Sequence, residues 1–375
     1  MKSILNEISV LRGAKPLTLD TTNKNRYRVE AIENDGSQTS YFFTTPIYNE
    51  ETRKGVDMNF HAYNDSFVCL GSNAKITANK SLRMENQAGC CEIVLPDRPT
   101  MNAEGSLFCE GLTLSPTTNG IAIKSDFKKQ KELILILEVD NPSLGIRANG
   151  RYFALMREKF RPFLIASCIG TTDEGGAIIA PAALNYQKIS ETRFLLSVLP
   201  TTLDGVSVQL EINLYEPKLF QDTTVESNSP NTNNVFGTIG FLGTTPEFGE
   251  QWLYTKPDYS KFPEIEERVI RSAVLHIPTY GGGVSEIRAY GVAFRFCSFG
   301  STWNRKVPEA QKFSSSKHCN DYFSVDLTPI FCNSHGRLLK NNGLILRTIQ
   351  GTHGFTAIAT SDSCLQPQIL EINYI

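Results

Sequence analysis

The chain has 375 residues, a hydrophobic fraction of 41% and a formal net charge of -2. This composition is sufficient to fill a core, which excludes wholesale disorder, and the length predicts two or three domains. A nearly neutral chain has no electrostatic reason to bind nucleic acid or anionic lipid. The longest apolar run covers only residues 133–137. We expect no membrane insertion, because a spanning helix needs roughly 20 apolar residues.

The first 25 residues show little hydrophobic alternation, which predicts an extended N-terminal arm. Asn6 and Glu7 interrupt the apolar stretch that a signal peptide would require. The expected protein therefore either stays inside the cell or leaves it by lysis or a dedicated route, without a classical signal peptide.

Residues 26–215 are predicted to form an N-terminal β domain. The continuously apolar residues 133–137 are typical of a central strand that is buried on both faces. Residues 206–214 alternate between apolar and polar side chains, which predicts a half-buried strand. Asn-Gly pairs at 119–120 and 149–150, and a further pair at 342–343, indicate hairpin turns.

The clearest domain boundary lies at residues 216–236, where a polar stretch rich in Asn, Ser and Pro follows Glu216-Pro217. Residues 216–375 are predicted to form a second β domain with almost no helix. The predicted fold is all-β, with tandem β-sandwich (jelly-roll-like) domains at 26–215 and 216–375 preceded by the arm at 1–25. The elements expected in the C-terminal domain are a short helical turn within 262–270 and strands at 273–277, 290–296, 322–331 and 370–374.

Eight segments of the C-terminal domain carry a family likeness through their order: 221–225, 236–243, 270–277, 287–290, Thr302-Trp303-Asn304, 322–328, 342–346 and 367–374. Through these segments the domain resembles the DNRLRE domain, a β-sandwich module of bacterial and archaeal surface proteins, over roughly residues 220–375. One position departs from the family pattern, because Trp252-Leu253-Tyr254 stands where family members often carry a basic, apolar strand. The resemblance implies a cell-surface or carbohydrate-binding role. No family is identified for residues 1–215.

The sequence contains no recognisable catalytic motif, nucleotide-binding loop or metalloprotease motif. His318, Cys319, Cys332 and His335 have the residue types of a zinc site. We expect residues 322–331 to form one extended strand, which would hold the two pairs about 33 Å apart. The sequence therefore predicts no metal, no cofactor and no catalytic residue.

Nine cysteines cannot all pair within one chain. Buried, reduced thiols are one interpretation, and cross-links between subunits formed after release are another. The cross-link candidates are Cys90, Cys91, Cys319 and Cys332. Trp252, Tyr254 and Tyr259 are candidate exposed aromatics, either for stacking on a sugar or for burial in a subunit interface. Trp303 is expected in the core, because it belongs to the motif shared with the family.

Three hypotheses of function follow. The first is a non-enzymatic structural subunit of an extracellular fibre, appendage or surface coat, as on a spore or in a phage, which forms a homo-oligomer or polymer through its N-terminal arm. The second is a carbohydrate-binding or adhesive surface module. The third is an enzyme acting on glycans through the N-terminal domain, because glycosidase carboxylates need no local motif. Under the first hypothesis the protein resides outside the cell or on the surface of a cell, spore or virion.

Overall fold

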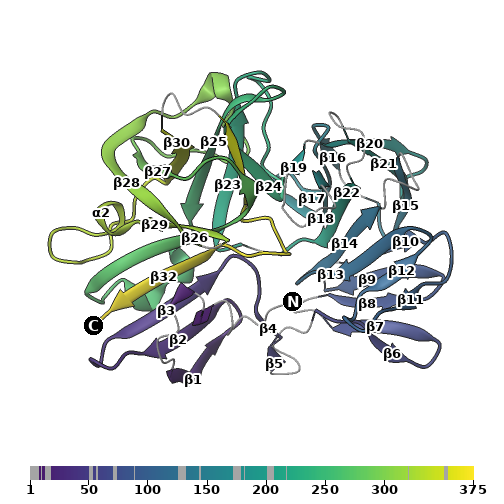
Figure 1. The fold of residues 1–375 in the computed structure, drawn as a ribbon, viewed down its shortest axis with the longest axis horizontal. Coiled ribbons are helices and arrows are strands. Elements are labelled where there is room, and N and C mark those ends of the chain that lie inside the picture. The colour runs from purple at the N-terminus through teal and green to yellow at the C-terminus, as the bar shows by residue number, and fades with distance from the viewer. Residues whose placement is uncertain are drawn as a thin grey trace.

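A computed structural model describes residues 8–9, 11–12, 18–49, 54–55, 58–70, 74–87, 89–125, 132–142, 145–171, 179–180, 182–200, 207–216, 218–319, 321–349 and 354–375. The predicted all-β fold is confirmed, since these residues form three large antiparallel sheets and one two-stranded sheet, with almost no helix (Figure 1). The helical elements of the described residues are short: η1 (Tyr259–Lys261), η2 (Pro263–Ile265), η3 (Trp303–Arg305) and α2 (Thr328–Phe331).

Two of the sheets come from the first 214 residues. The eight-stranded sheet has the order β20-β21-β15-β10-β9-β8-β7-β6, and the nine-stranded sheet has the order β11-β12-β13-β14-β22-β18-β17-β16, with β19 on β18. The strands of the first are β6 (His61–Tyr63), β7 (Ser66–Leu70), β8 (Lys75–Ala78), β9 (Ser81–Asn86), β10 (Gly89–Val94), β15 (Leu133–Val139), β20 (Ala182–Lys188) and β21 (Arg193–Pro200). Those of the second are β11 (Thr100–Met101), β12 (Leu107–Cys109), β13 (Leu112–Pro116), β14 (Gly120–Ser125), β16 (Gly145–Ala148), β17 (Tyr152–Glu158), β18 (Arg161–Thr171), β19 (Ile179–Ala180) and β22 (Ser207–Leu214).

The third sheet has thirteen strands and joins both ends of the chain. Eight of these strands close into a barrel in the order β26-β29-β28-β27-β30-β25-β24-β31, because β31 pairs again with β26. The strands β1, β2, β3 and β32 extend this sheet beyond β26, and β23 pairs with β25. The strands are β1 (Thr18–Asn25), β2 (Arg28–Ile32), β3 (Gln38–Phe43), β23 (Phe220–Glu226), β24 (Ile239–Thr245), β25 (Gly249–Pro257), β26 (Ile270–Gly282), β27 (Ile287–Val292), β28 (Glu309–Cys319), β29 (Tyr322–Asp326), β30 (Leu344–Thr348), β31 (Phe355–Ala359) and β32 (Ile369–Tyr374); the separate pair is β4 (Tyr48–Asn49) and β5 (Lys54–Gly55).

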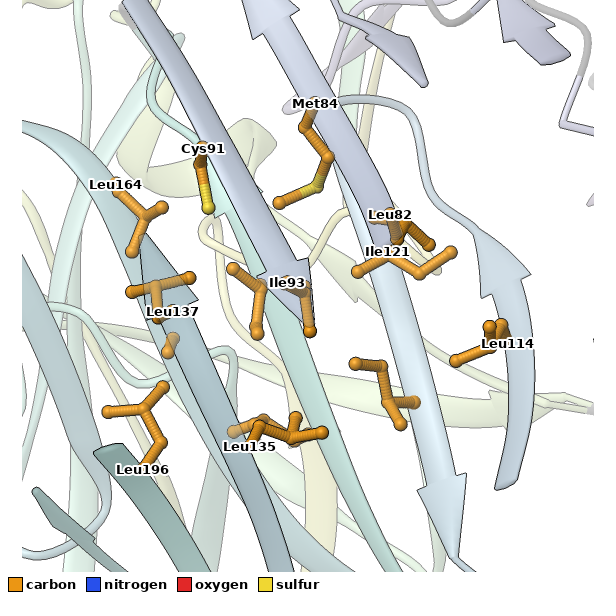
Figure 2. Close-up of a cluster of buried hydrophobic side chains, with 14 of the residues drawn as sticks. Leu82, Met84, Cys91, Ile93, Leu114, Ile121, Leu135, Leu137, Leu164 and Leu196 are labelled. Carbon is orange, nitrogen blue, oxygen red and sulfur yellow. The ribbon is translucent and has the colours of Figure 1, made fainter. Parts of the chain in front are cut away.

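The eight- and nine-stranded sheets contribute to one hydrophobic cluster. In Figure 2, Leu82 and Ile93 of the eight-stranded sheet lie next to Ile121 of the nine-stranded sheet, and Leu137 lies near Leu164. A second large cluster fills the barrel, with Leu253, Leu275 and Leu346 among its buried residues. Burial of such clusters supplies most of the free energy that holds β-sheets together.

The described N-terminal residues pack against other parts of the same chain. Residues 18–25 form β1, which pairs with β2, and β3 pairs along its whole length with β32 at the C-terminus. Ile8 is fully buried in a cluster with side chains of β2, β3 and β32. The described residues of the segment predicted as an extended arm therefore contact β2, β3 and β32 of the same chain. Residues 28–43, which the sequence analysis placed with 26–215, are hydrogen-bonded into the sheet of the C-terminal barrel.

Three local predictions were wrong. Residues 133–137 form the central strand β15, but Ile134 is 54% exposed, because the described residues cover only one face of this strand fully. Strand β22 is buried on both faces rather than half-buried, with Glu211 and Asn213 inside the molecule. The predicted strand at 322–331 ends at Asp326 and is followed by the helical turn α2, in which Pro329 occupies an early position.

Turn predictions were confirmed where the two flanking strands pair with each other. Residues 119–120 connect β13 to β14, and residues 149–150 connect β16 to β17. Gly150 has φ +83°, a left-handed conformation that favours glycine. Residues 342–343 do not form a hairpin, because β30 pairs with β25 and β27 instead of with the preceding strand.

Candidate functional site

Both tryptophans of the chain lie together on the outer surface of the barrel. Trp252 comes from β25 and Trp303 from η3, and their ring centroids are 5.3 Å apart with the planes inclined by 58°. Both rings are half-buried. Trp252 Nε1 donates a hydrogen bond of 2.9 Å to Glu250 Oε1, which fixes the orientation of its indole. The result is an ordered aromatic surface.

Two cations contact this aromatic pair. Lys306 Nζ lies 3.4 Å from the centroid of Trp303 and 4.3 Å from that of Trp252. The guanidinium carbon of Arg347 lies 5.4 Å from the centroid of Trp252 and 4.5 Å from that of Tyr290. Cation–π contacts at such distances contribute roughly 0.5–2 kcal/mol each. We name these five residues the tryptophan cluster.

Carboxylates border the cluster. Arg347 Nε donates to Glu309 Oε1 at 2.7 Å, so its charge is partly neutralised. Burial lowers the pKa of Lys306, and Glu250 opposes this effect. Indole faces, an ammonium group and carboxylates together suit a ligand with apolar ring faces and hydroxyl groups, such as a sugar.

The local sequence explains which aromatics reach the surface. Side chains alternate along β25, so Leu253 points into the barrel core while Trp252 and Tyr254 lie on the other face. The segment after β27 covers Tyr254, whose hydroxyl donates to the Val307 carbonyl at 2.9 Å and whose ring lies 5.6 Å from that of Phe296. Tyr254 is therefore fully buried.

Of the three aromatics expected on the surface, Trp252 is half-buried. Tyr254 and Tyr259 were expected on the surface, and both are buried, the latter at the start of η1 near Phe331. Trp303 was expected in the core and is half-buried in the tryptophan cluster. The sequence analysis also missed Lys306 and Arg347, because long-range contacts between a loop and two strands leave no local pattern.

Three of the four predicted cross-link cysteines are poorly placed for contact with a neighbour. Cys90, Cys91 and Cys332 are all buried, and burial raises the pKa of each thiol. The side chain of Cys319 lies outside the described residues. Cys297 is exposed in the segment after β27 and was not singled out from the sequence. Its neighbours Phe294 and Arg295 are also exposed. The irregular stretch rich in Ser and Gly that follows Cys297 is the one sequence pattern that could have indicated an exposed loop at this cysteine.

Cys297 is expected to be the fastest-reacting thiol among the described cysteines. Replacing it in the variant Cys297→Ser should remove about one equivalent of rapid labelling from the native chain, measured with a chromogenic disulfide reagent, because buried thiols are protected. The matched variant Cys91→Ser should leave the rapid phase unchanged. Full rapid labelling of the Cys297→Ser variant would contradict the exposure described for this residue.

A second group of polar side chains is buried where the nine-stranded sheet meets the C-terminal residues. Glu216 accepts hydrogen bonds from Arg26 and from the Tyr27 hydroxyl, and Lys218 pairs with Asp362. Burial raises the pKa of Glu216 to about 7 and lowers that of Lys218 to about 8.

This buried group surrounds a cavity of about 20 Å³. Such a volume holds about one water molecule and excludes an organic substrate. The ion pairs Arg26–Glu216 and Lys218–Asp362 therefore connect parts of the chain rather than bind a substrate.

Residues 322–331 were expected to form one extended strand that separates His318 and Cys319 from Cys332 and His335. This expectation was wrong, because the helical turn α2 interrupts these residues. Within the described ranges, no group of three or more His, Cys, Asp or Glu side chains is placed to hold a metal ion. The part of the chain that the structure describes also contains no helix with the length and hydropathy needed to cross a membrane.

Comparison with known protein families and with curated proteins finds no match for this chain.

Proposed function

We propose that the chain is a non-enzymatic structural subunit of an extracellular fibre, appendage or surface coat, and that it self-assembles through contacts between its β-rich parts. The observation that carries this proposal is the docking of the N-terminal segment, defined here as Ile8 and Arg12. Ile8 is fully buried against Tyr41, Phe43 and Ile369. Arg12 donates to Glu33 at 2.6 Å and to the Tyr41 hydroxyl at 2.9 Å.

A short docked segment of this kind can be exchanged between copies. Its contacts are made with β2, β3 and β32, so an identical surface is available on every neighbouring copy. Exchange of an identical element between protomers needs no new interface, because each copy recovers the contacts that it loses. Leu11 and Arg12 also form part of the wall of an open groove of about 500 Å³, which leaves one side of the segment accessible.

The order of the strands offers a second route to assembly. Strand β1 lies at the end of the thirteen-stranded sheet, and β6 and β20 lie at the ends of the eight-stranded sheet. The outer backbone of an edge strand carries unpaired N–H and C=O groups that can accept a further strand. We further propose that the eight- and nine-stranded sheets pack face to face as a β-sandwich, as one of the predicted tandem sandwich domains. Their common hydrophobic cluster supports this arrangement.

The substitution Ile8→Asp tests the exchange directly. It should abolish ordered assemblies in negative-stain electron microscopy while the chain stays folded, because a carboxylate cannot enter the apolar site of Ile8. The control Ser9→Asp adds the same charge at an exposed neighbouring position and should assemble normally. Normal assembly of a chain lacking residues 1–24 would refute the role of the N-terminal segment.

A carbohydrate-binding or adhesive module is the alternative function, and the tryptophan cluster favours it. Under this alternative, Trp303→Ala should remove binding on a glycan array, because the apolar face of a sugar ring would stack on the accessible part of this indole. The control Phe294→Ala changes an aromatic that is 67% exposed but lies outside the cluster. The absence of any glycan signal at high protein concentration would count against this alternative. The resemblance of residues 220–375 to the DNRLRE domain is compatible with either function.

A further inference from the structure

A lysine and two aspartates are buried together in the C-terminal part of the chain. Lys218 precedes β23, Asp222 lies within β23, and Asp362 lies in the loop between β31 and β32. The side chains of Lys218 and Asp362 form an ion pair and are 18% and 3% exposed. Asp222 is buried as well. The fold therefore brings an amine and two carboxyl groups together from distant positions in the sequence. We name these three residues the lysine–aspartate cluster.

Hydrogen bonds fix the positions of both carboxyl groups. Asp222 Oδ2 accepts a hydrogen bond of 2.6 Å from the backbone N–H of Ser361, the residue that precedes Asp362. The backbone N–H of Asp362 donates to Thr360 Oγ1 at 3.2 Å, which orders the loop. Among the described residues, Asp362 Oδ1 is buried against Lys218 and has no further hydrogen-bond partner. Groups held in contact in this way react as parts of one molecule, at a high effective concentration.

The surroundings of the cluster favour uncharged forms. Burial lowers the pKa of Lys218 to about 8, although Asp222 opposes this effect. Burial also raises the pKa of Asp222, and Lys218 opposes that effect. Lys218 Nζ lies 5.8 Å from the ring centroid of Tyr215, and the adjoining cavity of about 20 Å³ holds about one water molecule. A neutral amine and a protonated carboxyl group are thus accessible here, and they are the forms that condense to an amide.

We propose that Lys218 and Asp362 form an isopeptide bond within the chain, with Asp222 as the proton relay. The ion pair first becomes a neutral amine and a carboxylic acid by proton transfer from Nζ to the Asp362 carboxylate. Nζ then attacks Cγ of Asp362, and a C–N bond forms. Asp222 accepts a proton from Nζ and donates one to the departing hydroxyl group, whose C–O bond breaks. One water molecule leaves, the amide keeps one N–H, and no oxidant or further reactant is needed.

The bond would span the whole barrel along the chain. Strands β23 to β31 all lie between Lys218 and Asp362 in the sequence. A force that pulls on the two ends of the chain would therefore pass through the bond and leave residues 219–361 unstretched. This inference goes beyond the proposed function and does not depend on it, because the bond forms within a single copy.

Intact mass spectrometry of the full chain, reduced and denatured, tests the bond. The wild type should be lighter than its sequence mass by one water molecule, and peptide mapping should locate the link between Lys218 and Asp362. The pair Lys188–Glu191, with atoms 2.7 Å apart, is the internal control and should stay unlinked, because it is exposed to water. A wild-type chain of full sequence mass would overturn the proposal, and so would a loss of water located elsewhere in the map.

Four variants identify the roles of the cluster residues. Lys218→Met and Asp362→Ala should each have their full sequence mass, whereas Lys188→Met should still lose one water molecule. Asp222→Asn keeps both reacting groups, yet it should form the bond at least about tenfold more slowly, because positioned proton transfer contributes roughly 10²–10⁴-fold. Circular dichroism checks that each variant is folded, and the wild-type peptide map decides the proposal if one is not. Bond formation at the wild-type rate in Asp222→Asn would refute the relay.

Discussion

The substitution Arg151→Ala is expected to destabilise the chain by about 3–5 kcal/mol, because it leaves a carboxylate buried without its counter-charge. Arg151, which precedes β17, pairs with Glu226 of β23. Glu226 is buried and also accepts from the Gln251 amide at 3.3 Å. The guanidinium carbon of Arg151 lies 4.2 Å from the ring centroid of Phe248, which adds a cation–π contact between the two parts of the chain.

Two further variants distinguish the effect of losing the Arg151–Glu226 ion pair from the effect of losing side-chain packing at residue 151. Arg151→Met combined with Glu226→Gln should recover most of the stability, since neither side chain is then charged and the volume is nearly kept. The control Arg193→Ala breaks an exposed pair with Glu138 and should change stability by about 1 kcal/mol or less. The measurement is the midpoint of urea denaturation. Equal effects of Arg151→Ala and Arg193→Ala would contradict the burial of the Arg151–Glu226 pair.

The substitution Glu211→Gln is expected to stabilise the chain by about 3 kcal/mol at pH 8 and to change stability little near pH 4.5. Glu211 lies in the middle of β22 and is buried. Burial raises the pKa of its carboxyl from 4.5 to about 7, and this effect outweighs the opposing influence of the Cys364 backbone and Asn213. The Tyr280 hydroxyl and the Cys364 thiol, whose own pKa burial raises to about 12, also face this carboxyl.

The direction of the pH dependence follows from proton binding. Between pH 4.5 and 7 the folded chain keeps a proton on Glu211 that the unfolded chain has released, so the free energy of unfolding falls as the pH rises. Glutamine at 211 removes this contribution, whereas that of Glu216, whose pKa is also about 7, remains. The control Glu191→Gln changes a carboxylate whose side chain is 73% exposed. Parallel pH profiles for the wild type and the Glu211→Gln variant, measured by thermal unfolding, would contradict the burial of Glu211.

Alternation in the sequence was sufficient to predict that the chain is all-β and where many strands lie. Residues 370–374, for example, fall within β32. Alternation could not show that β32 pairs with β3, because these strands lie at opposite ends of the chain. It also could not show that the strands of the C-terminal part close into a barrel, since closure depends on β26 pairing with β29 and with β31 at different points along its length.

Exposure was harder to predict than strand position, because it depends on what covers each face. The polar residue Glu211 indicated a solvent-facing side of β22, yet that side is covered by the C-terminal residues. The segment between β27 and β28 buries Tyr254 and brings Trp303 next to Trp252. The opposite case is Ile134, an apolar residue that remains exposed. Each of these outcomes depends on contacts between residues that are distant in the sequence.

We propose that this chain is a structural subunit that assembles with copies of itself. Negative-stain electron microscopy of the purified full chain at increasing concentration tests it most directly. We predict ordered polymers for the wild type and for Ser9→Asp, and none for Ile8→Asp, whose Ile8 site lies at the junction of β2, β3 and β32. A wild-type chain that forms no ordered assembly at any concentration would contradict the claim.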